Sequence, residues 1–491
     1  MYRSIFTAAG GCVLALAVVV PAIVLVVRSV AGQAPSAGWV PSARQWGLLM
    51  DTAGLAAAAV CVSTVCALPA AYAVGQFGRL SDKPLMVALM VVPLLLPPMV
   101  YAFGWQRLIA LPGRAQCIWV WSSWAWPIPA LIIGSGWSRF GRGGYEAALL
   151  SASAWSAFLR VALPVLIRYV ATGWLVLLVL FMGEYSVPHA CGLNVYATDL
   201  LGLAESYGSR ASEVLWPSLP LLAVLAAAGG TAWTLWRRSA AEEDVLPTAS
   251  GPPRASKGLI LVVAGLVLGT VVLPIAGLAW HPSIRSWMAE AWRTYHVELL
   301  QSIGVSVASG VVAVAMGAGL ALWPLGRGVG TALALAFGIL PGALIGQALV
   351  VTYLHVSIVY DHWPIVVLSY VARFGWVGML MGCLAVANVR RELVDQARAD
   401  GADEFVVDTR VRLYPNWPVL ASGVLLVAAL SLADVTAITL VRIPSIGTIS
   451  LTLIEKWHRF EDSMLASLSL WLVLSALPSA VFLALALRRR G

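Results

Sequence analysis

The residues of this chain that could do chemistry are two acidic side chains at the ends of apolar runs. Glu184, followed by Tyr185, ends one run, and Asp434 ends another 250 residues later. Ionisable side chains at membrane depth are costly and are functional candidates by default. Two carboxylates that face each other, with Tyr185 as a further oxygen ligand, suit a cation or a hard metal ion such as Fe(III). The alternative is that each carboxylate is hydrogen-bonded to a neighbouring loop or forms a gate contact.

Other polar residues within apolar runs are weaker candidates. Arg373 needs an acidic partner at membrane depth, for which we name Asp361. Tyr101 and Gln347 lie in runs that prolines must bend, so they could line a path through the membrane. Packing explains these two residues equally well.

Motifs of known catalytic chemistry do not stand out. The phosphate loop G-x-x-x-x-G-K-[ST], the zinc motif H-E-x-x-H and the nucleophile motif G-x-S-x-G are all absent. The six cysteines have no C-x-x-C spacing, so we interpret them as small side chains that face lipid or the core. We predict no catalytic residue, no cofactor and no firm metal site. Without the phosphate loop, the chain cannot bind and split ATP by the usual route.

The composition indicates a membrane protein. The chain has 60% hydrophobic and 11% charged residues and a mean hydropathy of +0.86, which is too apolar for an ordinary soluble domain. Apolar runs of about 20 residues cross a bilayer as helices. The net charge of +8 does not indicate a nucleic-acid partner, because the basic residues are scattered and only three are lysines. We therefore predict an all-α integral membrane protein that contacts lipid and no nucleic acid.

About twelve spans are expected, and prolines interrupt the third and ninth. A tryptophan-rich segment at 119–126 opens the fourth span and is interpreted as an aromatic belt at one membrane interface. The other spans lie near 6–27, 47–73, 85–108, 165–182, 216–236, 258–280, 302–325, 331–354, 364–387, 417–440 and 464–487.

An internal repeat organises these spans. Similar residues recur at a distance of 250: Asp51 and Gln301, Gly54 and Gly304, Glu184 and Asp434, Glu205 and Glu455. Equivalent halves with six spans each have the same orientation, so we predict two parallel six-helix repeats. The expected domains are a first repeat at 1–236, a charged linker at 237–257 and a second repeat at 258–491.

Two loops outside the spans and the linker share a residue pattern. Each is expected to form a short helix, a turn and a second helix, at about 145–164 and 393–415. The basic residues favour one side of the membrane, which places both loops and both chain ends in the cytoplasm. The residues that define the loops are Glu146, Ala147, Ala148, Ser151, Phe158 and Pro164 in the first, and Asp395, Ala397, Gly401, Phe405 and Pro415 in the second.

The loops resemble the cytoplasmic "EAA" loop of type I ABC-importer permeases. That motif has E-A-A, three further residues and then a glycine, followed about nine residues on by an aliphatic residue, one further residue and a Leu-Pro pair. The resemblance implies that each loop forms a coupling helix that docks on an ATPase subunit, with aromatic anchors such as Phe405. Ser151 replaces the glycine in the first loop, and Asp395 replaces the glutamate in the second. The alternative is that each loop is only a solvated helix between spans.

Two permease halves in one chain resemble the ferric iron importers, with thiamine and aminophosphonate importers as relatives. The resemblance implies a homodimeric ATPase, an extracytoplasmic substrate-binding protein and alternating access in the inner or plasma membrane of a prokaryote. Ferric iron is the expected substrate, and thiamine or an aminophosphonate is the alternative. A different class, a secondary transporter driven by an ion gradient, also stays open.

Overall fold

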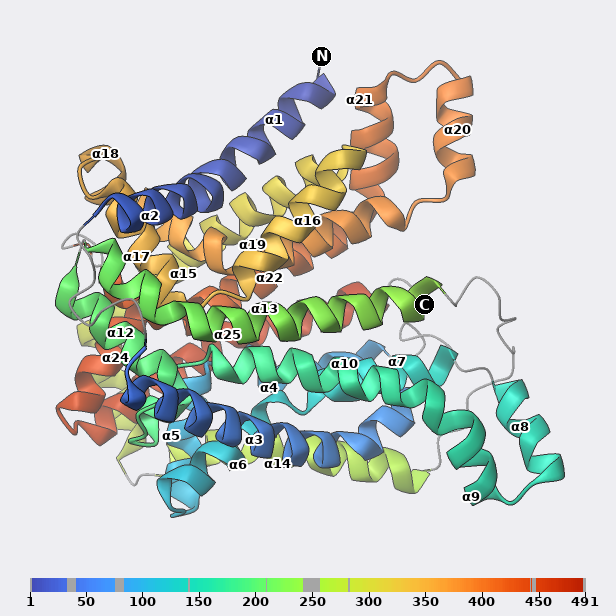
Figure 1. Ribbon diagram of the computed structural model, residues 1–491, viewed down its shortest axis with the longest axis horizontal. Helices are drawn as coiled ribbons and strands as arrows, with labels where there is room; N and C mark the ends of the chain where they lie inside the picture. Colours follow the sequence, from blue (N-terminus) through green and yellow to red (C-terminus); the bar gives the residue numbers. More distant parts are fainter. Residues whose placement is uncertain are drawn as a thin grey trace. The chain divides into compact units, whose positions relative to one another are not determined.

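All regular secondary structure in the residues that the structure describes is helical (Figure 1). The structure is a computed structural model that describes residues 2–32, 41–75, 84–139, 142–208, 210–241, 257–280, 283–441, 443 and 447–488. Within these residues, nine helices are long and apolar enough to cross a bilayer, or up to twelve if each of three bent helix pairs is one span. The expected all-α, multi-pass membrane architecture is confirmed. Most of the expected linker, 242–256, lies outside the described residues.

Contacts divide the chain into two compact units. Unit 1 holds Met1–Gln45, Ala197–Pro220 and His281–Phe482, and unit 2 holds Trp46–Tyr196, Leu221–Trp280 and Leu483–Gly491. These units do not coincide with the two halves expected from the sequence, because each unit contains helices from both halves. The N-terminal helices α1 (Tyr2–Leu14) and α2 (Val20–Ala31) belong to unit 1, and α14 (Lys257–Ala279) belongs to unit 2.

Unit 2 is built around helices that pack through small residues. A Cβ atom on Gly277 of α14 would lie 2.2 Å from the carbonyl oxygen of Gly104 on α5, so glycine lets the two backbones touch. The helices that contribute to unit 2 are α3 (Ala43–Gly75), α4 (Pro84–Leu95), α5 (Pro98–Leu108), α6 (Gly113–Ala125), α7 (Pro127–Arg139), α8 (Arg142–Ser151), α9 (Ala154–Ala157), α10 (Leu163–Met182), α11 (Ser186–Ala190), the later part of α13 (Ala211–Ala241) and α14.

Unit 1 packs around α15 (Ile284–Ala321), which contacts α1, α19 and α22. Its core includes Tyr370, Ile345 and Val427. The other helices of unit 1 are α2, α12 (Tyr196–Tyr207), α16 (Pro324–Gly338), α17 (Gly342–Tyr353), α18 (Ser357–Tyr360), α19 (Pro364–Ala387), α20 (Arg391–Ala399), α21 (Glu404–Val406), α22 (Trp417–Ala433), α23 (Thr436–Leu440), α24 (Ile449–His458) and most of α25 (Asp462–Arg488).

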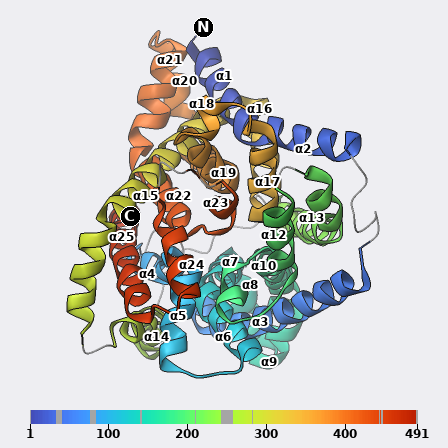
Figure 2. The same ribbon diagram turned by 90° about the vertical axis from the view of Figure 1, so that its left-hand side faces the viewer.

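Each unit contains a span that a proline breaks in the middle. The helix turns by 97° between Leu89–Leu95 and α5, at Pro97, and by 107° between Gly328–Gly338 and α17, at Pro341. Proline has no N–H to donate and disfavours a helical residue before it, which explains both breaks. The helix after each break packs against a five-residue helix, α5 against α11 and α17 against α23. Figure 2 shows α17, α19 and α23 together in unit 1.

The tryptophans of segment 119–126 do not form the expected aromatic belt. Trp121, Trp124 and Trp126 are all buried in unit 2. The indole N–H of Trp126 donates to the Thr270 hydroxyl at 3.2 Å. The indole N–H of Trp124 donates to the Leu96 carbonyl at 3.1 Å. These side chains therefore fill the core of the unit, because a large ring with one polar atom can be buried when that atom finds a partner.

Candidate functional site

The second loop folds into a helical hairpin, as the sequence predicts. Helix α20 ends at a left-handed residue, Gly401, whose φ is +84°. Its N–H donates to the Arg398 carbonyl at 3.1 Å, and the next N–H, of Ala402, donates to the Ala397 carbonyl at 3.0 Å. This closure of the helix end favours glycine at that position. Asp403 then begins α21 by accepting the Val406 N–H at 2.8 Å.

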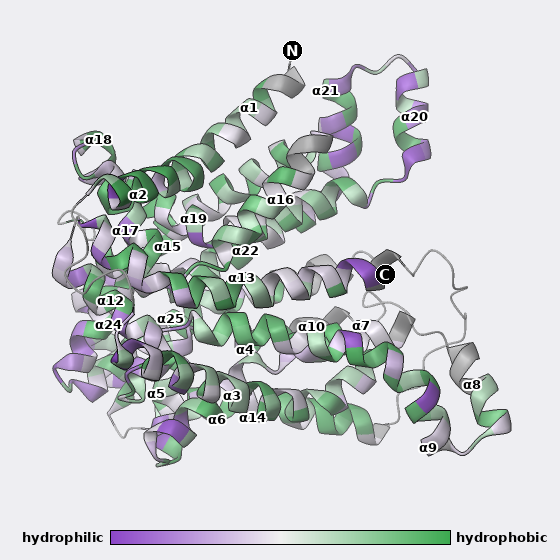
Figure 3. Ribbon diagram, in the orientation of Figure 1, coloured by the Kyte–Doolittle hydropathy of each residue, from purple (hydrophilic) through white to green (hydrophobic). Residues whose placement is uncertain are grey.

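An ion pair also joins the two helices of the second hairpin. Arg398 lies 2.8 Å from Glu404 across the turn and 3.7 Å from Asp395 on its own helix. All three side chains are exposed, so the pairs orient the turn more than they stabilise the fold. In Figure 3, much of α20 and α21 has the colour of hydrophilic residues, whereas α19 and α22 of unit 1 are mostly hydrophobic.

The first loop forms the same kind of hairpin with a different turn. Helix α8 contains Glu146, whose side chain lies outside the described ones, and ends at Ser151 without a left-handed glycine. The Ala152 N–H donates to the Ala148 carbonyl at 2.9 Å. Ser153 then accepts the Ser156 N–H at 3.3 Å, at the start of α9.

Ser153 and Asp403, which sequence reasoning missed, lie 250 residues apart and cap equivalent helices. Serine and aspartate are both favoured helix-capping residues, so their shared spacing was the available signal.

A π-helical segment follows the short second helix in both hairpins. These segments are Phe158–Ala162 and Val407–Leu413, and Pro164 and Pro415 each follow after one intervening residue. A proline inside a helix removes one backbone hydrogen bond and crowds the preceding turn, and a wider turn accommodates this. The proline of each loop thus sets how the hairpin enters the next span, α10 or α22.

Both hairpins expose apolar side chains next to charged ones. Leu150 on α8 is 91% exposed, and Leu393 on α20 is 52% exposed. Trp155, Phe405 and Tyr414 are exposed as well, while Phe6 of α1 stacks on Phe405 with 6.3 Å between ring centroids. Exposed apolar and aromatic residues beside charges are typical of surfaces that bind another protein.

The candidate carboxylate Glu184 caps the short helix α11. One of its oxygens accepts the N–H of Ser186 at 2.7 Å and the hydroxyl of the same residue. The other accepts the Val187 N–H and the indole N–H of Trp121, both at 3.0 Å. The side chain is buried. All four donors are neutral, and three of them come from α11 itself.

Asp434 caps α23, which begins 250 residues after α11 begins. It accepts the Ala437 N–H at 3.3 Å and forms an ion pair with Arg373 at 2.9 Å. The prediction that Arg373 pairs with Asp361 is therefore wrong. Asp361 follows the exposed helix α18, whereas the fold brings α22 and α23 against the middle of α19.

In each unit, side chains bind the capping carboxylate and donate to the carbonyl before the proline that breaks the span. Different residues do this in the two units. In unit 2, Trp121 donates to Glu184, and Trp124, one helical turn along α6, donates to the carbonyl before Pro97. In unit 1, Arg373 alone pairs with Asp434 and donates to the carbonyl of Leu340, directly before Pro341, at 3.2 Å. Each arrangement fixes a capped short helix to a broken span.

The remaining candidate path residues also have protein partners. The Tyr185 ring stacks on the His189 ring, with 4.8 Å between centroids. The Tyr101 hydroxyl donates to the Ser123 carbonyl at 2.9 Å, and the Gln347 amide donates to the Gly208 carbonyl. No group of three or more histidine, cysteine or acidic side chains that could hold a metal ion occurs among the described residues.

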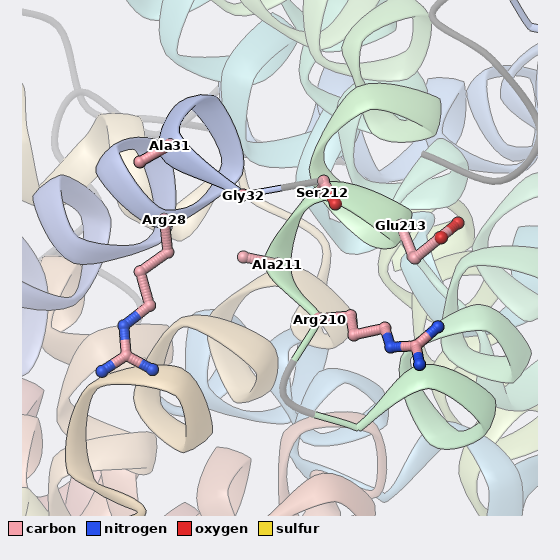
Figure 4. Close-up of a pocket in the computed structure, with 7 residues that line it drawn as sticks. All are labelled: Arg28, Ala31, Gly32, Arg210, Ala211, Ser212 and Glu213. Carbon is pink, nitrogen blue, oxygen red and sulfur yellow. The ribbon is translucent and has the colours of Figure 1, made fainter. Parts of the chain in front are cut away.

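A surface cleft of about 390 Å³ lies in unit 1, between the end of α2 and the start of α13 (Figure 4). Arg28 and Arg210 line it, together with Ser212 and the buried Glu213. In Figure 4 the two guanidinium groups point in different directions, so they do not converge on one ligand position. No protein-family model matches this chain, and no curated protein matches its sequence.

Proposed function

We propose that this chain is the membrane permease of a binding-protein-dependent ABC importer, and that its two hairpins dock on a separate ATPase. The observation that carries the proposal is the pair of hairpins with shared spacing. Both have a cap at the same repeat position, a π-helical segment before a proline, and exposed apolar side chains. Exposed apolar side chains do not stabilise a hairpin that contacts only solvent.

The carboxylate-capped helices support a role in alternating access. Helices α11 and α23 are short, start 250 residues apart, and pack against the broken spans α5 and α17. A short helix attached to a bent span is suited to move as a small gate when the ATPase pulls on the hairpin of the same unit. In this proposal Glu184 and Asp434 position the gates.

The substrate part of the proposal names ferric iron, with thiamine and an aminophosphonate as alternatives. The support for a cation was the two carboxylates and Tyr185, and each now has protein partners. Arg373 also brings a positive charge to within 2.9 Å of Asp434. Uptake of radioactive Fe(III), compared between wild type and the Glu184→Gln and Asp434→Asn variants, tests this part by itself.

The docking test uses residues whose replacement cannot disturb the core. Leu150→Asp and Leu393→Asp place a charge on each hairpin at an exposed position. We expect the tagged chain, purified from its own host, to bring down a P-loop ATPase that mass spectrometry identifies, and each variant to lose much of it. Ile358→Asp on α18, where the side chain is 75% exposed, is the matched control. Equal ATPase recovery from all four proteins would contradict the docking role.

A secondary transporter is the second candidate, because the buried Arg373–Asp434 pair is the kind of group that couples ion movement to transport. Uptake into vesicles separates the two. The importer needs ATP and survives collapse of the proton gradient, whereas the secondary transporter shows the reverse.

A further inference from the structure

Two of the six cysteines meet in unit 2, although 74 residues separate them. The side chain of Cys117 on α6 interacts with that of Cys191, which directly follows α11. Cys117 is fully buried and Cys191 is partly exposed. A disulfide needs its sulfur atoms at about 2.05 Å, so the two thiols must approach each other to form one.

The backbone around both cysteines is fixed independently of the thiols. A Cβ atom on Gly113, at the start of α6, would lie 2.8 Å from the carbonyl oxygen of Cys191, so the two segments are in contact. Gly192, with a φ of +69°, closes the end of α11 through hydrogen bonds to His189 and from Leu193 to Pro188. Cys191 is therefore held against the first turn of α6.

The positions 250 residues later carry valines instead of cysteines. They are Val367 and Val441, both buried in the core of unit 1. Two valines of similar size fill the same places by packing alone. Packing therefore does not require a cysteine at either position, and the property that distinguishes these two residues is the reactivity of their thiols.

We propose that Cys117 and Cys191 are a reversible disulfide site that locks α11 to α6. The Cys191 thiolate attacks a small disulfide oxidant and releases one thiol, which gives a mixed disulfide. The Cys117 sulfur then attacks the Cys191 sulfur and gives its proton to the departing group, which leaves as the second thiol. Two thiols and one disulfide thus become one disulfide and two thiols. With the Trp121–Glu184 hydrogen bond at the other end of α11, the bond would fix this short helix at both ends.

The bond itself is tested without transport. The purified protein is treated with oxidised glutathione, its free thiols are alkylated, and its peptides are mapped by mass spectrometry. We expect a linked peptide pair containing Cys117 and Cys191 that reductant separates, while Cys61 and Cys66 on α3 stay alkylated. Alkylation of both Cys117 and Cys191 after oxidation, or glutathione attached to Cys191 without a link, would overturn the proposal.

The locking effect rests on the proposed gate role of α11, and a second measurement addresses it. Oxidation is expected to stop uptake in the wild type and reductant to restore it, while Cys191→Val, which copies the residue at position 441, stays active in both states. A link that forms without changing uptake would overturn the locking role and leave the disulfide site intact. Uptake that lacks any ATP requirement would instead contradict the importer function.

Discussion

The ion pair between Arg373 and Asp434 makes the sharpest prediction about stability. The side chain of Asp434 is 3% exposed and that of Arg373 is 18% exposed, so solvent screens the pair weakly. Removing one member of a buried pair leaves the other charge without compensation and typically costs about 3–5 kcal/mol. We therefore expect Asp434→Asn to lower the free energy of unfolding by about 3 kcal/mol or more.

The corresponding change in unit 2 is expected to be milder. Trp121→Phe removes one N–H donor from Glu184 and keeps an aromatic ring next to Phe181, on which the Trp121 ring stacks with centroids 4.9 Å apart. A single hydrogen bond to a charged group contributes about 1.5–3 kcal/mol. Of the two variants, Asp434→Asn should therefore be the less stable.

Unfolding in detergent, followed by tryptophan fluorescence, measures both variants, and a double variant supplies the control. Arg373→Met with Asp434→Asn removes the uncompensated charge as well as the pair, so it should recover much of the loss seen in Asp434→Asn alone. The double variant is compared with Asp434→Asn and Arg373→Met measured singly. If its loss of stability equals the sum of the two single losses, the charges do not interact and the reasoning about the pair is wrong. If Asp434→Asn is no less stable than wild type, the carboxylate is not needed as the partner of Arg373.

Two further predictions concern groups outside the spans. Replacing a helix cap by alanine, in Asp403→Ala or Ser153→Ala, should lower the stability of the capped helix by about 1 kcal/mol. Faster amide hydrogen exchange in α21 or α9 would report this loss. Unchanged exchange would show that the caps are dispensable. A hydrogen bond to Glu461, with one to Tyr295, raises the pKa of Lys456 above its ordinary 10.5. A pKa that is raised in the folded protein stabilises the fold at pH values below the pKa of the unfolded side chain. The difference in melting temperature between wild type and Lys456→Met should therefore be constant up to about pH 10 and shrink above it. A difference that shrinks toward acid pH would contradict this sign.

The sequence predicted those features that depend on local pattern. Apolar runs predicted the spans, prolines predicted the breaks at Pro97 and Pro341, and the loop glycine predicted the turn at Gly401. Partners across the fold were not predictable, because they depend on which faces of distant helices meet. Arg373 was assigned to a nearby carboxylate and pairs with one 61 residues away.

Burial of the tryptophans was missed for a related reason. A cluster of indole rings is equally compatible with a membrane interface and with a core that offers hydrogen-bond acceptors. Only the carbonyl freed at the Pro97 break and the Glu184 carboxylate distinguish the two, and both reach α6 through tertiary packing. The sequence likewise identified Glu184 and Asp434 as unusual without showing that each caps the helix that follows it.

The difference between the two caps indicates which short helix moves more easily. Glu184 takes three of its four hydrogen bonds from α11, so the carboxylate and α11 can shift together. Such a shift breaks the bond to Trp121 and the bond at 2.7 Å from the Gln106 amide on α5 to the Ala190 carbonyl of α11. A shift of α23 with Asp434 instead breaks a buried ion pair, which costs about 3–5 kcal/mol. For α11 the bond to Trp121 costs about 1.5–3 kcal/mol and the neutral bond from Gln106 about 0.5–1.5 kcal/mol. We therefore expect α11 to be the more mobile gate, and the proposed disulfide would act on that helix.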